Sequence, residues 1–81
     1  MSYFVYILEC ADGTFYTGYT NNLERRLYVH NNLKSAAHYT KIRRPVSLKY
    51  FETLETKGQA LKRECIIKKL TKAEKRKLLG L

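Results

Sequence analysis

The sequence predicts an α+β fold, with a small three-stranded antiparallel sheet flanked by helices in the order ββαβαα. Two strand-like segments open the chain around a turn at residues 11–13, and a third, Val46–Leu54, comes later. Between and after these strands, the apolar spacing and capping residues are typical of helices. With 81 residues, the length suits one hydrophobic core, so we expect residues 1–81 to form a single domain.

The first two strands follow from the residues at their centres. Tyr3–Cys10 is apolar and rich in β-branched and aromatic side chains, and Thr14–Thr20 has a similar character. The turn between them contains Gly13, so the two segments should form a hairpin. A helix is expected over Leu23–Asn31, with an N-cap at Asn21 or Asn22, and a basic loop over Lys34–Arg44, closed by Pro45, follows it. The third strand ends before a turn at Thr56–Gly58, and a second helix covers Gln59–Leu70. A short last helix begins at the capping box of Thr71 and Glu74 and ends at Gly80.

The length of the hairpin turn decides how two tyrosines face. A two-residue turn would place Tyr6 and Tyr16 on opposite faces of the sheet. A three-residue loop with Gly13 in the left-handed third position pairs Tyr6 with Gly18 and places both tyrosines on one face. We expect the three-residue loop, with Gly18 leaving open space beside both phenols. Each tyrosine would otherwise be read as a core aromatic with a satisfied hydroxyl.

Positive charge is the unusual feature of the composition. The chain has 16 Lys and Arg against 7 Asp and Glu, a formal net charge of +9. The first 20 residues contain Glu9 and Asp12 and no Lys or Arg, so this segment carries −2 and the rest +11. Such an excess disfavours a cationic substrate and favours a polyanion, either nucleic acid or an acidic membrane surface.

Other classes of protein fit less well. The start of the chain lacks the basic and apolar regions of a signal peptide, and no apolar run approaches membrane-spanning length. Two cysteines, Cys10 and Cys65, form neither a disulfide framework nor a zinc set. We therefore expect a cytoplasmic protein. Peripheral membrane binding is disfavoured as well, because no predicted helix has the wide apolar face that it requires.

Two polar residues fall on the inward side of the first predicted helix. Arg26 and His30 are four residues apart and should contact the same space. The ordinary explanation of Arg26 is a surface residue whose stem covers apolar area. That of His30 is a boundary residue or a cation at the helix C-terminus. Their shared position also makes them candidates for a functional site.

Glu64 is the sharper signal, because it lies in the middle of an apolar helix face. The apolar arc of this second predicted helix is formed by Ala60, Leu61 and Ile67. A carboxylate facing a core is costly unless it is paired or bound to a metal. Two explanations stay open: a salt bridge with Lys68 or Arg26, or a ligand for a hard divalent cation.

In their order and spacing, these residues resemble the GIY-YIG nuclease superfamily, in particular its small stand-alone bacterial branch. The matching segments are Phe4-Val5-Tyr6, Tyr16-Thr17-Gly18, Asn22–Leu27, Ala37–Val46, and Ala60–Lys69 with its Glu64. The resemblance covers essentially the whole chain. Phe4 stands where the pattern has its first Gly and Thr17 where it has Ile, and an Asn that several members carry after the Glu helix has no obvious counterpart here.

The resemblance implies a three-stranded sheet flanked by helices that cuts phosphodiester bonds with one divalent metal ion, Mg²⁺ or Mn²⁺. It assigns Tyr6, Tyr16, Arg26, His30 and Glu64 to the catalytic site, with Glu64 as the metal ligand. Arg26 would contact the phosphate oxygens, and Tyr6 or Tyr16 would accept the proton of the attacking water, with its pKa lowered by neighbouring cations. His30 could orient a phenol or the phosphate.

Nucleic acid, most simply DNA, is the expected partner. Basic and aromatic groups interleave in the predicted loop and suit phosphate contact and base stacking. The candidates for binding are Lys34, His38, Tyr39, Lys41, Arg43, Arg44 and Lys68. The leading hypothesis is a metal-dependent endonuclease, monomeric by default, with weak sequence preference. The alternative is a nucleic-acid-binding module with this fold that has little activity of its own or depends on a partner protein for targeting.

Overall fold

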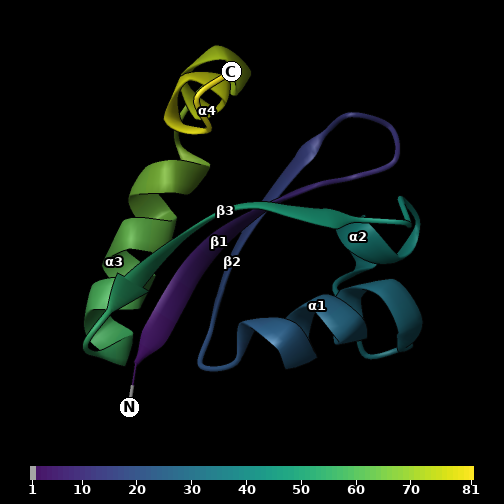
Figure 1. Ribbon diagram of the computed structural model, residues 1–81, viewed down its shortest axis with the longest axis horizontal. Coiled ribbons are helices and arrows are strands. Elements are labelled where there is room, and N and C mark those ends of the chain that lie inside the picture. Colours follow the sequence, from purple (N-terminus) through teal and green to yellow (C-terminus); the bar gives the residue numbers. More distant parts are fainter. Residues whose placement is uncertain (1) are drawn as a thin grey trace.

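The structure is a computed structural model that describes residues 2–81 (Figure 1). Its elements in chain order are β1 (Tyr3–Glu9), β2 (Phe15–Thr20), α1 (Leu23–Asn32), α2 (His38–Lys41), β3 (Ser47–Leu54), α3 (Lys57–Lys68) and α4 (Lys72–Leu78). The predicted α+β fold is confirmed. The one addition to the expected order is α2, a single helical turn inside the segment predicted as a basic loop.

The sheet is antiparallel with strand order β2-β1-β3, so β2 and β3 are its edges. In the hairpin, the N–H of Cys10 donates to the carbonyl of Thr14 at 2.8 Å, and Tyr6 pairs with Gly18. Gly13 has a φ of 82°, the left-handed conformation that glycine adopts without strain. The predicted three-residue loop and its register are therefore confirmed, and Tyr6 and Tyr16 share one face.

Helices cover both faces of the sheet, as Figure 1 shows with α3 and α4 on one side of the strands and α1 and α2 on the other. The core under α3 consists of Val5, Ile7, Ala60 and Ile67. The core on the opposite face consists of Tyr6, Leu8, Cys10 and Val46. Alternation along β1 sends odd-numbered residues to the first core and even-numbered residues to the second.

Side-chain caps fix where the helices begin. The Asn22 side chain accepts a hydrogen bond from the first turn of α1, as predicted. Thr71 and Glu74 form the predicted capping box of α4. Thr56 and Gln59 form a second capping box, so α3 begins two residues before the predicted start at Gln59. The predicted turn at residues 56–58 is thus the cap and first turn of a helix.

The end of α1 is capped by an arginine from the basic segment. The Arg44 guanidinium donates to the carbonyl of His30 at 2.6 Å, to that of Val29 at 3.3 Å, and to that of Leu33. The His30 carbonyl lies in the last turn of α1, where helix carbonyls lack intrahelical partners. The carbonyls of Val29 and Leu33 also accept backbone N–H groups, from Leu33 and Ala36. Arg44 therefore supports the fold, and its contact with phosphate stays a prediction. Within residues 2–81, no helix is long and apolar enough to cross a membrane.

Candidate active site

A chain of three buried side chains links the sheet to α1 and α2. The Tyr6 hydroxyl lies 2.8 Å from His30 Nε2, and His30 Nδ1 lies 2.7 Å from Thr40 Oγ1. The single hydroxyl proton of Thr40 goes to the carbonyl of Ala37, at 3.0 Å. Thr40 Oγ1 must therefore accept from His30 Nδ1–H, which leaves Nε2 as an acceptor for the Tyr6 hydroxyl. The chain fixes one tautomer of a neutral imidazole.

Burial explains the protonation states along this chain. His30 is fully buried, and desolvation, followed by the charges of Arg26 and Arg44, lowers its pKa to about 4. Desolvation raises the pKa of Tyr6 to about 12, although hydrogen bonding and charge from Arg26 oppose the rise. The expectation that neighbouring cations lower the phenol pKa is therefore wrong for Tyr6, because burial outweighs the cation.

Tyr16 and Gly18 lie against the same chain. The Tyr16 ring packs edgewise on His30, with ring centroids 5.2 Å apart and an interplanar angle of 62°. A Cβ at Gly18 would lie 2.5 Å from the Tyr6 hydroxyl and 3.3 Å from Tyr16 Cε2. The space expected beside Gly18 is thus occupied by the Tyr6 phenol, and only glycine lets that phenol extend across β2.

Arg26 lies beside Tyr6 on the α1 side of the sheet. The two side chains line one narrow crevice, which Leu23 and Leu27 also border. The stem of Arg26 therefore covers apolar area, as its ordinary explanation required. Its charged head also acts on Tyr6 and on His30, since it lowers the pKa of both groups. Covering apolar area and acting on the phenol and the imidazole are compatible roles for one long side chain.

Glu64 is half-buried on α3, four residues after Ala60 and three before Ile67, which are both fully buried. Only 17% of its side chain is exposed, and its Oε2 lies 3.7 Å from Lys68 Nζ. One of the two open explanations, the salt bridge with Lys68, is thus present. The negative charge of Glu64 also contributes to the raised pKa of Tyr6, which places the carboxylate within electrostatic range of the phenol. Leu61 is 41% exposed and lies outside the buried arc.

The donor set suits one kind of metal ion. Among residues 2–81, no three His, Cys, Asp or Glu side chains gather where they could hold a metal. Mg²⁺ commonly keeps several waters and is held by one or two carboxylates together with phosphate oxygens of the substrate. A single carboxylate such as Glu64 fits an ion of this type, whose other ligands are waters and phosphate oxygens of the substrate.

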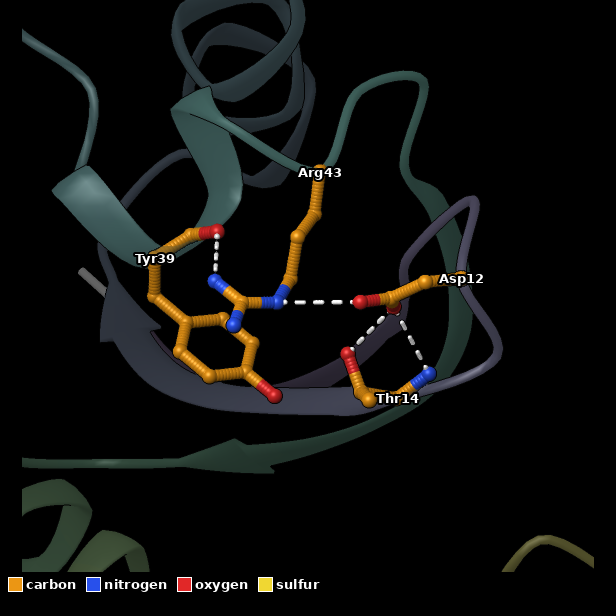
Figure 2. A network of polar contacts seen from close by, with 4 residues as sticks. All are labelled: Asp12, Thr14, Tyr39 and Arg43. Carbon is orange, nitrogen blue, oxygen red and sulfur yellow. Dashed lines mark hydrogen bonds and ion pairs between the residues drawn. The ribbon is translucent and has the colours of Figure 1, made fainter.

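Arg43 joins the basic segment to the hairpin turn, as Figure 2 shows. Its Nε donates to Asp12 Oδ2 at 3.0 Å, and its Nη1 donates to the carbonyl of Tyr39 at 3.1 Å. Its Cζ lies 3.9 Å from the centroid of the Tyr39 ring, and Asp12 is held in turn by the backbone N–H and hydroxyl of Thr14. The guanidinium thereby fixes the Tyr39 ring, whose centroid is 6.0 Å from that of Tyr16.

Four of the other candidate binding residues lie at the protein surface. Lys34, His38, Lys41 and Lys68 are exposed, and Lys41 Nζ donates to the carbonyl of Lys34 at 3.3 Å. Sequence reasoning missed Thr40, which no local pattern distinguishes from a loop threonine. Its role depends on a contact with His30, ten residues away, that only the folded chain creates.

The sequence and the fold agree with one family of proteins. Residues 2–77 match the model of the GIY-YIG catalytic domain, and the chain belongs to that family. More particularly, it is similar to proteins named UPF0213. One from Syntrophus aciditrophicus is 53% identical over 76 residues, covering 94% of this chain and 87% of that protein. The UPF0213 protein SERP0126 of Staphylococcus epidermidis is 53% identical over 77 residues, covering 95% and 93%.

Solved structures of similar proteins show the same fold. The solution NMR structure of the UPF0213 protein BH0048 from Bacillus halodurans has 39% identity and a TM-score of 0.63, and the alignment covers 99% of this chain and 84% of that one. The solution NMR structure of the protein EF2693 from E. faecalis has 44% identity and a TM-score of 0.67, with the same coverage. The resemblance inferred from the sequence motifs is confirmed.

Proposed function

We propose that this protein is a divalent-metal-dependent endonuclease that hydrolyses phosphodiester bonds in DNA with weak sequence preference. Membership of the GIY-YIG family supports a nuclease. The observation that carries the proposal is the hydrogen-bonded chain from Tyr6 through neutral His30 to Thr40, beside Arg26. Buried polar groups are costly to assemble, and this chain ends at a phenol next to a cation that suits a phosphate.

The proton of the attacking water leaves along that chain. A phenol whose pKa is about 12 stays protonated at neutral pH, so Tyr6 cannot act as a phenolate. It can instead take a proton from water while its own proton passes to His30 Nε2, which is already the acceptor of its hydrogen bond. The low pKa of His30 opposes this transfer by roughly 4 kcal/mol at neutral pH.

The substrate itself relieves part of that cost. The charge of Arg26 is one cause of the low pKa of His30. A phosphate paired with Arg26 would neutralise this charge and make the imidazole a better proton acceptor. Arg26 would also donate to the non-bridging oxygens as negative charge builds on them. Proton acceptance and phosphate binding are thereby coupled through one arginine.

Glu64 is the residue that would hold the metal ion, Mg²⁺ or Mn²⁺. When bound, the ion supplies Lewis-acid stabilisation of the phosphate and the leaving oxygen. Lys68, which pairs with Glu64 in the structure, would then be released toward the nucleic acid. This exchange keeps the carboxylate paired both before and after the metal binds.

The test is nicking of branched and single-stranded DNA with Mg²⁺ or Mn²⁺. We expect Glu64→Gln and Tyr6→Phe each to lower the rate by at least about 100-fold. Glu55→Gln is the matched control, because Glu55 is exposed and precedes α3, and it should retain wild-type activity. Equal rates for wild type and Glu64→Gln would contradict the proposed site.

The ion pair between Glu64 and Lys68 favours a second candidate function. If that pair persists in solution, the carboxylate is not free for a metal, and the protein binds nucleic acid without cutting it. Binding in the presence of EDTA, with no cleavage of any substrate after Mn²⁺ is added, would support this alternative over the nuclease.

A further inference from the structure

Two surface pockets of similar composition lie at opposite ends of β2. The first, of about 460 Å³, is lined by Tyr3, Tyr19, Thr20, Asn21, Arg26 and Lys57. The second, of about 220 Å³, is lined by Thr14, Phe15, Tyr39, Lys72 and Lys75. Each combines two aromatic rings with two cations, and neither lining, as the described residues define it, includes an acidic side chain. Aromatic rings and cations together suit a base and its phosphate.

Both pockets include residues of β2 or of the turn before it, and the first also includes Tyr3 of β1. Because β2 is an edge strand, no other strand covers its outer side. The second pocket lies beside Phe15, the first residue of β2, and the first pocket contains Thr20, the last. At about 3.3 Å per residue, these ends are about 17 Å apart, a distance that a few nucleotides can span. Tyr16 and Gly18 lie on β2 between them.

This edge is also where side chains from the two faces can meet. Tyr6 and Tyr16 belong to the face under α1, and Glu64 belongs to α3 on the other face. A phosphate centred over the sheet would be screened from one of these groups by the strands. A phosphate at the outer side of β2 is accessible from both faces, and Gly18 adds no side chain to block the Tyr6 phenol.

The second pocket is held in shape before any ligand binds. The Tyr39 ring is fixed by Arg43, which is itself anchored to Asp12 in the hairpin turn (Figure 2). Lys72 Nζ lies 5.9 Å from the centroid of the Phe15 ring. A ring already fixed in place loses less conformational entropy when a base stacks on it.

We propose that a single nucleic-acid strand runs along the outer side of β2, with one nucleotide in each pocket and the scissile phosphate between them. The choice of nucleic acid rests on the proposed function; the path rests on the two pockets. Lys72 and Lys75 of α4 and Lys57 of α3 are then binding residues. The ligand lies along a sheet edge, and no helix is inserted into the groove of a duplex. The protein therefore binds an extended single strand rather than an intact duplex.

Binding is measured without cleavage, by fluorescence anisotropy of a labelled oligothymidine of about eight nucleotides in EDTA. We expect Lys57→Gln to weaken binding several-fold, and the pair Lys72→Gln with Lys75→Gln to weaken it roughly tenfold. Each lost contact should lower the slope of log K against log salt by about 0.7. Lys49→Gln on β3, the opposite edge, is the matched control and should bind as wild type does.

The span of the path is tested by combining the changes. On the octamer, the fold-losses from the two pockets should multiply, because the sites are far apart and share no side chain. On a dinucleotide, which cannot reach both pockets, we expect them not to multiply. Amide shifts in an NMR titration should follow β2 and the starts of α3 and α4.

Two outcomes would overturn the proposed path. One is an equal loss of binding in Lys49→Gln and in the pocket variants. The other is a set of amide shifts confined to β3 or to residues 34–41. If either result is found together with normal cleavage, the proposed path is wrong and the nuclease proposal stands. If the expected binding pattern is found without any cleavage, the nuclease proposal is wrong and the path stands.

Discussion

The two faces of the sheet use burial in opposite ways. Under α3, four aliphatic side chains form an uncharged core, and among residues 2–81 Thr17 is the one buried polar side chain on this face. Under α1 and α2, buried Tyr6, His30 and Thr40 form a continuous hydrogen-bonded chain. The first face stabilises the fold through apolar area, and the second buries polar groups whose cost is offset by hydrogen bonds among them.

The largest test of this comparison is the response of stability to acid. His30 has a pKa of about 4 in the folded protein against 6.5 for an ordinary histidine. As pH falls below 6.5, His30 of the unfolded chain binds a proton, whereas His30 of the folded chain stays neutral. The contribution of His30 to the free energy of unfolding is therefore complete above pH 6.5 and is lost as the pH falls toward 4. The loss is roughly 3 kcal/mol in total. Urea unfolding at a series of pH values measures it.

His30→Gln should flatten this part of the pH profile, whatever it does to absolute stability. His38→Gln is the control, because His38 is the other histidine of the chain and is exposed. It should leave the wild-type slope unchanged. If the free energy of unfolding of His30→Gln depends on pH as that of the wild type does, burial of neutral His30 does not cause the loss of stability in acid.

The next effect concerns the close approach of Tyr6 to β2. In Gly18→Ala, the new Cβ meets the Tyr6 hydroxyl at 2.5 Å, so the phenol or the strand must move. We expect a loss of about 2 kcal/mol of stability, measured by urea unfolding, and a larger loss of nicking activity. Gly58→Ala is the control, since its Cβ meets only Thr56 Oγ1 at 4.0 Å, and that variant should be neutral or slightly more stable.

The smallest expected effect concerns Thr17, on the apolar face of the sheet under α3. Thr17 is buried on the α3 face, and its Oγ1 has no hydrogen-bond partner among residues 2–81. Thr17→Val keeps the shape of the side chain and removes the unsatisfied hydroxyl, so stability should rise by about 1 kcal/mol. Thermal unfolding measures this gain. A loss of stability would indicate that the hydroxyl is satisfied in solution.

Local signals in the sequence predicted most of the fold. The cap at Asn22, the capping box at Thr71 and the left-handed Gly13 each depend on residues a few positions apart, and all three are confirmed. The start of α3 was missed even though Thr56 and Gln59 carry the same capping-box pattern. In that case the signal was present, and the Lys-Gly pair after Thr56 suggested a turn instead.

Features that depend on distant residues could not be predicted. Helix α2 has no side-chain cap and is one turn long, and its Thr40 is buried through contact with His30. Likewise, the guanidinium of Arg44 reaches carbonyls 11 to 15 residues away. The sequence indicated only that Thr40 and Arg44 lie in a basic loop. Helical periodicity, which is itself a local property, placed Glu64 and Arg26 on partly buried helix faces, as the structure has them.

The cap that Arg44 provides has a practical consequence for handling the protein. Its hydrogen bonds are part-buried and made to helix carbonyls, so dissolved ions screen them weakly. Contacts between exposed lysines and phosphates are weakened steeply by the same ions. On the proposed function, a high-salt wash should therefore remove co-purified nucleic acid from the protein on a column, while the hydrogen bonds of Arg44 at the end of α1 and the fold are retained.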